Sequence, residues 1–588
     1  MSSGIFVQGE NCWRIERASR AAVIVDAADY FRTARDAMLQ AREQILLVGW
    51  DVDPRILLDP DLAEGGDGDE PPNCLAQFIP WLVRRRPELR INLLIWNMGF
   101  LKMLTRGLSI FTILRWRMTR NVSIRFDSSH PIGATHHQKI LVIDDSVALC
   151  GGIDMTEDRW DTPEHLDGDP RRCRPNGKPY MPWHDTAGMI EGPAAAALGD
   201  LARERWKRAT GRVLPVPASH GGIWPERVEP LFHDRAIAIA RTHPKSEGAA
   251  EVREIEQLYV DMIAAAKRFI YADNQYFASR RVAEAIARRL TERRPPEIVI
   301  VNPISADGWL QEAAMGSARA ELFFALAEID RDDHFQIYTP VTAGRKPIYV
   351  HSKLLIVDDR ILRVGSSNMN NRSMGLDSEC DIALEGEASD APDPAIRRLR
   401  EALMAEHLGV APDAVRDAFD RTGSLIATVE CLIGTAKSLI PFEPHQWSDA
   451  TLAIGASGLL DPDRSTSGSS PCRTGACSAA SCGAVPGNCS TRSARSAAPG
   501  ANAIAAAGGA NSASCGTRPA SSTIDGRPAP RQSPAFILVR TPRCAVPEPC
   551  RSPCSRAPSC RSPPSPPTPR RPRSIPRSTA RCWTSGRR

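Results

Sequence analysis

The sequence predicts an α/β fold of two similar lobes, a pseudo-dimer, in which each lobe is a mixed, mostly parallel sheet flanked by helices. Apolar, β-branched runs alternate with amphipathic helical segments as far as residue 445, a pattern typical of parallel sheets covered by helices. One polar motif occurs twice, near residues 137 and 351, each time beside such a run. After about residue 460 periodic apolar segments give way to an Arg-, Pro-, Ser- and Ala-rich composition, which predicts a disordered tail.

The first lobe is expected to occupy residues 1–210. Apolar residues at helical spacing predict one helix over 27–43 and another over 193–209. Short apolar runs between them predict strands at 44–53, 90–97, 122–129, 135–144 and 146–154. The Pro- and Gly-rich segment 211–235 is expected to link the lobes.

The second lobe is expected over residues 236–445 and repeats this plan. Helices are predicted at 250–267, 280–293 and 309–328, and strands at 268–277, 297–304 and 335–340, ahead of the second motif. The segment 424–442 is apolar but is interrupted by Glu430 and Lys437, so we expect an amphipathic or core helix there. No stretch offers eighteen uninterrupted apolar residues, as a membrane-spanning helix requires.

The repeated motif has the form H-x-K-x-x-x-x-D, and its surroundings repeat as well. It comprises His137, Lys139 and Asp144 in the first copy and His351, Lys353 and Asp358 in the second. A glycine follows each histidine at the same offset, and Asp154 and Asn368 then occupy equivalent positions. Further on, Asp185 and Glu379 each open an apolar strand that closes on Glu-Gly. One motif alone carries little weight, but matched offsets in two copies argue against a purely structural origin.

The motif residues suit a tetrahedral phosphate. Side chains two apart on a strand point to the same face, so each copy offers one imidazole and one ammonium to a common space. A pair of buried lysines without an anion would cost several kcal/mol in desolvation. An anionic substrate between the two copies is therefore the economical interpretation.

Four stretches together resemble the two-motif class of the phospholipase D superfamily over roughly residues 8–440. They are THHQKILVIDDSVALCGGIDMTEDRWD at 135–161, PWHD at 182–185, IYADNQYF at 270–277 and IYVHSKLLIVDDRILRVGSSNMNNRSMGLDSE at 348–379. The resemblance implies a ping-pong phosphodiesterase with a phosphohistidine intermediate. It implies His137 as the nucleophile and His351 as the general acid and base, and the pseudo-symmetry leaves the reverse assignment open.

The resemblance also implies roles for the remaining motif residues. Lys139 and Lys353 would hold the non-bridging phosphate oxygens. Asn368 would contact the phosphate, whereas Asp154 is a candidate either for that contact or for orienting a lysine. The acids would divide into two kinds: Asp185 and Glu379 hydrogen-bond the imidazoles, and Asp144 and Asp358 anchor the fold.

We expect no cofactor and no catalytic metal, because two lysines and two imidazoles can supply the charge that divalent ions supply elsewhere. A zinc site formed by His136, His137 and His184 is a disfavoured alternative. His136 lies one residue from His137 and therefore points to the opposite face of the strand.

The resemblance implies a glycerophospholipid substrate, phosphatidylcholine-like, with water or an alcohol as acceptor. Eighteen of the 74 basic residues and two of the 69 acidic ones lie beyond Arg464, which leaves −11 for residues 1–464 and disfavours a nucleic-acid substrate. Segment 99–120 mixes apolar and basic residues, so it is either a lipid-docking segment or a core helix. A cardiolipin-synthase-like phosphatidyltransferase and a non-catalytic lipid-binding scaffold remain alternatives.

The tail, residues 460–588, has ten cysteines without C-x-x-C pairing, and from Ser465 onward it has arginine without lysine. A GC-rich gene translated out of frame gives such a composition, so we hypothesise that the natural chain diverges near 460–466; resequencing that junction tests the idea. Six scattered cysteines in the body and an N-terminus without a secretory signal favour a cytoplasmic protein, peripheral at the inner membrane surface. A monomer suffices for the chemistry.

Overall fold

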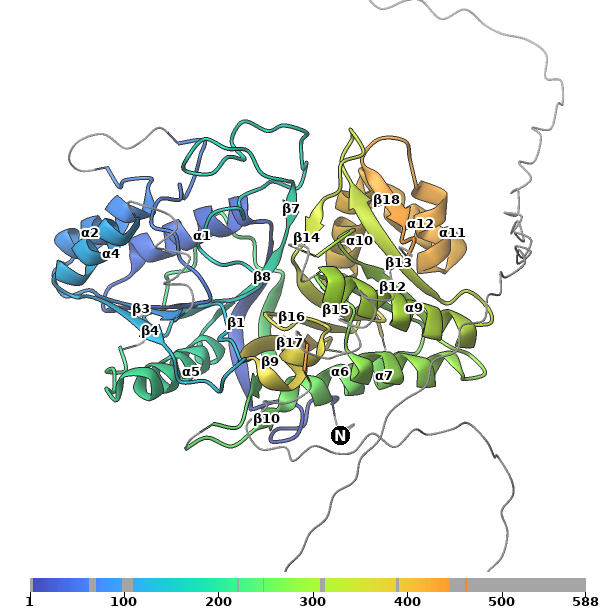
Figure 1. Cartoon of the computed structure of the whole chain (residues 1–588), viewed down its shortest axis with the longest axis horizontal. Coiled ribbons are helices and arrows are strands. Elements are labelled where there is room, and N and C mark those ends of the chain that lie inside the picture. Colours follow the sequence, from blue (N-terminus) through green and yellow to red (C-terminus); the bar gives the residue numbers. More distant parts are fainter. Residues whose placement is uncertain are drawn as a thin grey trace, which may run out of the picture. The chain divides into compact units, whose positions relative to one another are not determined.

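The computed structural model describes residues 4–62, 70–97, 109–218, 221–246, 248–306, 312–387, 391–444 and 461–462 (Figure 1). All of them belong to one compact unit, Met1–Ser478. Apart from residues 461–462, the predicted tail and the proposed frame junction near 460–466 lie outside the described residues, as do residues 99–108 of the candidate lipid-docking segment. None of the described helices has the length and apolar character needed to cross a membrane.

Fifteen strands form the continuous path of one large sheet that runs through both lobes. The first lobe contributes β1 (Arg14–Val25), β2 (Gln44–Gly49), β3 (Arg90–Trp96), β4 (Val122–Asp127), β5 (Ile140–Ile143), β6 (Val147–Gly151) and β8 (Thr186–Glu191). The second contributes β9 (Phe232–His243), β11 (Phe269–Asn274), β12 (Glu297–Val301), β13 (Phe335–Val341), β15 (Lys353–Val357), β16 (Ile361–Gly365), β17 (Glu379–Glu385) and β18 (Ser438–Pro441). A short strand, β10 (Val252–Arg253), pairs with β9 off this path.

The two lobes have the same strand order and meet edge to edge. From the junction outward, the order β1-β8-β6-β5-β2-β3-β4 in one lobe matches β9-β17-β16-β15-β11-β12-β13 in the other. The long strands β1 and β9 pair antiparallel, with Arg14 opposite Ile239 and Ala21 opposite Phe232, and this pairing makes one sheet of the two. The sequence analysis did not predict either of these junction strands.

The predicted α/β class and the two similar lobes are confirmed, but the expectation of mostly parallel pairing needs correction. In the large sheet, the described parallel pairs are confined to β2-β3-β4 and β11-β12-β13. The motif strands β5 and β15 each turn back into the next strand through only a few residues, and so short a connection permits only antiparallel pairing.

Helices cover both faces of this sheet. In the first lobe, α1 (Ala27–Gln40), α2 (Leu75–Arg85) and α4 (Ser109–Met118) pack on one face, as α6 (Glu254–Ala265), α7 (Arg280–Leu290) and α9 (Ser317–Ile329) do in the second. The π-helix η1 (Glu312–Gly316) directly precedes α9. A core that continues through both lobes includes residues of α5 (Pro193–Thr210), α10 (Pro394–Leu408), α11 (Pro412–Thr422) and α12 (Leu425–Leu432). A second π-helix, η2 (Arg372–Leu376), lies just ahead of β17.

The segment 424–442 is not one helix. Helix α12 ends at Leu432, and β18 then adds an antiparallel edge strand to β13. Gly434 lies in the break between the two, and the unpaired edge of β13 gives the following residues backbone partners that a longer helix would not use.

Candidate active site

Both motif aspartates follow their strands directly and lie in tight turns. Asp144 and Asp358 have positive φ angles of 50° and 56°, which aspartate tolerates better than most residues. The Asp144 carboxylate accepts hydrogen bonds from three successive backbone amides at the start of β2, those of Arg42, Glu43 and Gln44. The Asp358 carboxylate accepts the equivalent three at the start of β11. Both carboxylates therefore hold the motif turn to its neighbouring strand, as an anchoring role requires.

The residue after each motif aspartate forms a second matched contact that the sequence analysis missed. Asp145 accepts two hydrogen bonds from Arg203 of α5, and Asp359 accepts two from Arg400 of α10. These bidentate pairs are buried and attach the same helix of each lobe to its motif turn. The equal positions of Asp-Asp in the two motifs were the available sequence signal.

Each motif imidazole is held by a carboxylate of the opposite lobe. His137 Nδ1 lies 3.0 and 3.1 Å from the two carboxylate oxygens of Glu379. His351 Nδ1 lies 2.7 Å from Asp185 Oδ2. Both acids are fully buried, whereas the His137 side chain keeps 16% of its surface exposed. With Nδ1 directed at an acid, Nε2 is the ring nitrogen left for a substrate.

Short backbone contacts between the lobes fix these crossed pairs. His136 and Ser378, the residues ahead of His137 and Glu379, form a parallel bridge. On the other side β7 (Trp183–His184) and β14 (Tyr349–Val350), ahead of Asp185 and His351, form a two-stranded parallel sheet. The lobes are therefore joined at the positions from which the imidazoles and acids project.

The two motif lysines are buried close to their own histidines. Lys139 Nζ donates to the backbone oxygen of His137 at 2.9 Å and pairs with Asp154 Oδ2 at 3.2 Å. Lys353 Nζ donates to the backbone oxygen of His351 and to Gln275 Oε1 at 3.0 Å. The contact with Lys139 is the lysine-orienting alternative expected for Asp154, and Gln275 was not predicted.

Electrostatics keep both imidazoles neutral in the free protein. Burial, reinforced by Lys139 and Lys353, holds the pKa of His137 well below its usual range. Burial and then Lys353 do the same to the pKa of His351, and Arg159, another residue the sequence analysis missed, adds to the effect. Each lysine thus acts on the imidazole of the other motif, so the four groups share one electrostatic environment. A neutral imidazole is the form that can attack phosphorus.

Burial also shifts the pKa values of Glu379, which contacts His137, and of Lys353. It raises the pKa of Glu379 to about 8, against the opposing effect of Ser366, Lys139 and Ser373. It lowers the pKa of Lys353 to about 7. A bound phosphodiester anion would oppose the effect of burial on the pKa of Lys353 and of His137, because negative charge beside these groups favours their protonated forms.

The remaining candidate residues are Asn368 and the three histidines considered as a zinc site. Asn368 is buried in the loop ahead of η2, and its Oδ1 has no hydrogen-bond partner among the described residues. The disfavoured zinc site is not formed by the described residues: His136 contacts Asp127 and Ser378, His137 contacts Glu379, and His184 contacts Glu406.

Each lobe thus supplies one imidazole, one lysine and the acid that contacts the imidazole of the other lobe. The model of the Phospholipase D family matches residues 326–430. The chain is 24% identical to Phospholipase D A of Dictyostelium discoideum over 66% of its own length and 35% of that protein. It is 26% identical to Phospholipase D alpha 1 of Arabidopsis thaliana over 48% of its length and 50% of that protein.

These matches, together with the two H-x-K-x-x-x-x-D motifs, support the phospholipase D superfamily as the family of this chain. Phospholipase D alpha 4 of Arabidopsis thaliana is 24% identical over 70% of this chain and 66% of that protein. The chain spans about a third to two thirds of the length of these three relatives. The phosphatidylserine synthase of Haemophilus influenzae Rd KW20 superposes with a TM-score of 0.46 at 12% identity, over 70% of this chain and 95% of that structure.

Proposed function

We propose that the protein is a phospholipase D that cleaves the head-group phosphodiester of glycerophospholipids and passes the phosphatidyl group to water or an alcohol. The observation that carries this is the pair of crossed contacts, His137 with Glu379 and His351 with Asp185. They leave two Nε2 atoms and two buried lysines for a single phosphate. The names of the relatives support the lipid substrate.

In the proposed first step, Nε2 of neutral His137 attacks phosphorus. The N–P bond forms while the bond from phosphorus to the head-group oxygen breaks, and His351 donates its proton to the leaving alkoxide. Lys139 and Lys353 stabilise the negative charge on the non-bridging oxygens. Glu379 stabilises the positive charge that develops on His137.

In the second step His351, now neutral, removes a proton from water or an alcohol. The new O–P bond forms and the N–P bond breaks, which returns His137 to its neutral form and restores the proton of His351. The low pKa of both free imidazoles fits this scheme, because the one required proton arrives together with the negative charge of the substrate.

Helix α4 supports an approach to a lipid surface. Ile113 and Trp116 are buried in the core of the first lobe. Phe111, Leu114 and Met118, three to four residues apart, are 66%, 48% and 81% exposed on the other side. Exposed apolar side chains interspersed with basic ones are typical of a helix that lies in a membrane interface.

The test is incubation with phosphatidylcholine vesicles and a primary alcohol. We expect phosphatidyl-alcohol together with phosphatidic acid, and a ³²P label on residue 137 when the reaction of a lipid labelled in its phosphate is stopped early. A label at 351 instead would reverse the two histidines. Product with only a lipid acceptor, such as phosphatidylglycerol, would favour the phosphatidyltransferase, and no product from wild type or His137→Ala would favour the scaffold.

A charge on α4 separates lipid docking from chemistry. Phe111→Glu should lower turnover on vesicles at least tenfold while leaving hydrolysis of soluble bis(p-nitrophenyl) phosphate unchanged. Phe324→Glu, a change at a phenylalanine of α9 that is also largely exposed, is the matched control and should alter neither activity. Equal vesicle activity in both variants would remove α4 from the proposal.

A further inference from the structure

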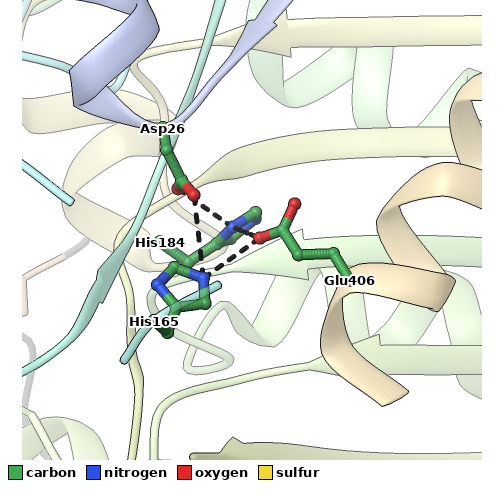
Figure 2. A group of neighbouring side chains, drawn as sticks. All are labelled: Asp26, His165, His184 and Glu406. Carbon is green, nitrogen blue, oxygen red and sulfur yellow. Dashed lines mark hydrogen bonds and ion pairs between the residues drawn. The ribbon is translucent and has the colours of Figure 1, made fainter. Parts of the chain in front are cut away.

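A second polar cluster lies at the junction of the lobes and takes no direct part in the proposed chemistry. It consists of Asp26, His165 and His184 from the first lobe and Glu406 of α10 from the second (Figure 2). Asp26 precedes α1, and His184 is the last residue of β7. Both histidines and Asp26 are completely buried.

The four side chains converge on one point. One ligand atom from each lies within 4.8 Å of the other three. Glu406 Oε1 is 2.7 Å from His184 Nδ1 and 3.1 Å from His165 Nε2. Asp26 Oδ1 is 3.3 Å from His184 Nδ1, and Asp26 Oδ2 is 3.7 Å from His165 Nε2.

These separations leave room for a small metal ion between the four side chains. Ligands about 2.0–2.1 Å from a tetrahedral zinc ion lie roughly 3.3 Å from one another. The four separations lie on both sides of that value: the two made by Glu406 are of hydrogen-bond length, and the two made by Asp26 are longer than ordinary hydrogen bonds to nitrogen.

The far nitrogen of each imidazole faces a further carboxylate. His165 Nδ1 lies 3.0 Å from Asp161 Oδ2, and Asp161 is itself neutralised by Arg172. His184 Nε2 lies 3.5 Å from Asp273 Oδ2. A carboxylate behind a ligating histidine is the usual arrangement in metal sites, because it fixes the tautomer and directs the free lone pair at the ion.

The carboxylates of the cluster have no direct lysine or arginine partner among the described residues; Lys437 acts on Glu406 and Asp26 electrostatically but pairs with neither. In the part of the chain that the structure describes, the ion-pair partners of Asp26, Glu406 and Asp273 are imidazoles alone. Asp26 Oδ2 is buried without a hydrogen-bond partner. Buried carboxylates need either extra protons on the imidazoles or a cation between them.

We propose that Asp26, His165, His184 and Glu406 bind one divalent transition-metal ion, with zinc preferred. Two imidazoles and two carboxylates are a donor set that zinc accepts, whereas calcium and magnesium prefer oxygen alone. Four protein ligands leave no open position for a substrate, so the ion is structural and the absence of a catalytic metal in the proposed reaction is unaffected.

The ion would join the lobes directly behind the second imidazole. The backbone oxygen of His184 accepts from the amide of His351 at 2.7 Å, and the next residue, Asp185, holds the His351 ring. Three ligands come from one lobe and one from the other, so loss of the ion would loosen this contact. The site is independent of which phosphodiester the protein cleaves.

The test is metal analysis of the full chain, purified without added metal, with thermal unfolding followed before and after chelation. We expect about one zinc per chain, a fall in Tm of at least 5 °C on chelation, and recovery with Zn²⁺ but not Mg²⁺. His165→Gln and Asp26→Asn should each lose one equivalent of zinc. His243→Gln, at a histidine whose Nε2 contacts Arg208, should retain it.

The cysteines of residues 460–588 could bind zinc independently, so the spectrum of the Co²⁺ form identifies the ligands. Cobalt in the proposed site gives weak visible bands without thiolate-to-metal charge transfer, and His165→Gln abolishes them. Less than 0.1 zinc per chain, together with an unchanged Tm in excess Zn²⁺, would overturn the proposal in favour of protonated imidazoles. Unaltered zinc content in both ligand variants would overturn it as well.

Discussion

The change Glu379→Gln tests whether the crossed acid supports His137 as the proposed mechanism requires. Glutamine keeps the size of the side chain and offers one oxygen to His137 Nδ1, but it carries no negative charge. The hydroxyl groups of Ser366 and Ser373, which contact Glu379, can rotate to suit an amide. The fold should therefore survive, while the side chain at position 379 can no longer become negative when His137 becomes positive.

The expected loss follows from the geometry. Glu379 is fully buried and meets His137 Nδ1 with both oxygens at 3.0 and 3.1 Å. A hydrogen bond to a charged group contributes about 1.5–3 kcal/mol, which corresponds to a factor of about 10 to 150 in rate. Loss of the acid behind a serine-protease histidine costs about 10⁴. We expect kcat to fall about 10²- to 10⁴-fold.

The assay is steady-state hydrolysis of bis(p-nitrophenyl) phosphate, with Tm measured on the same preparations. Glu385→Gln, the same change at the other end of β17 where Glu385 pairs with Arg360, is the matched control and should change kcat less than about threefold. A folded Glu379→Gln protein with wild-type kcat would refute the role given to this acid.

Three further outcomes are expected. Burial lowers the pKa of Lys353 to about 7, so the free protein loses this charge as pH rises through 7, and kcat/KM for a soluble diester should decline above that pH; a flat profile from pH 6 to 9 would contradict the assignment. Asp358→Ala leaves three backbone amides without their acceptor and should lower the free energy of unfolding, measured in a urea titration, by about 2–4 kcal/mol. The control Asp332→Ala, at an exposed aspartate, should lower it by less than about 0.5 kcal/mol. Arg400→Met leaves the buried carboxylate of Asp359 without its partner and should lower the free energy of unfolding by about 3–5 kcal/mol. Adding Asp359→Asn should restore part of this free energy. Equal stability of wild type and Arg400→Met would show that the ion pair contributes nothing.

Strand alternation and the internal repeat were enough to predict the two lobes, because the same local sequence pattern occurs in each lobe. The motif strands and most of the predicted helices lie within a few residues of their expected positions, whereas helices α2, α10 and α11 were not predicted. The junction strands β1 and β9 escaped prediction, because their amphipathic pattern does not reveal which edge of which lobe they will pair with.

The contacts within the candidate site were also predicted only in part. That Asp185 and Glu379 would support imidazoles was predicted, but the crossing of these contacts between the lobes depends on strand pairings far apart in the chain. Gln275 near Lys353 and Arg159 near His351 stand outside the repeat, so no periodic signal marked them.

The sequence alone determined the fold class, the duplicated motif and the residue types that face a phosphate, because strand periodicity and repeat offsets are local properties of the chain. Only the tertiary structure decided which acid supports which imidazole and brought Asp26, His165, His184 and Glu406 to one point. These four residues come from loops, a short strand and a helix end that lie up to 380 positions apart, and no local pattern encodes a contact formed when two lobes close on each other.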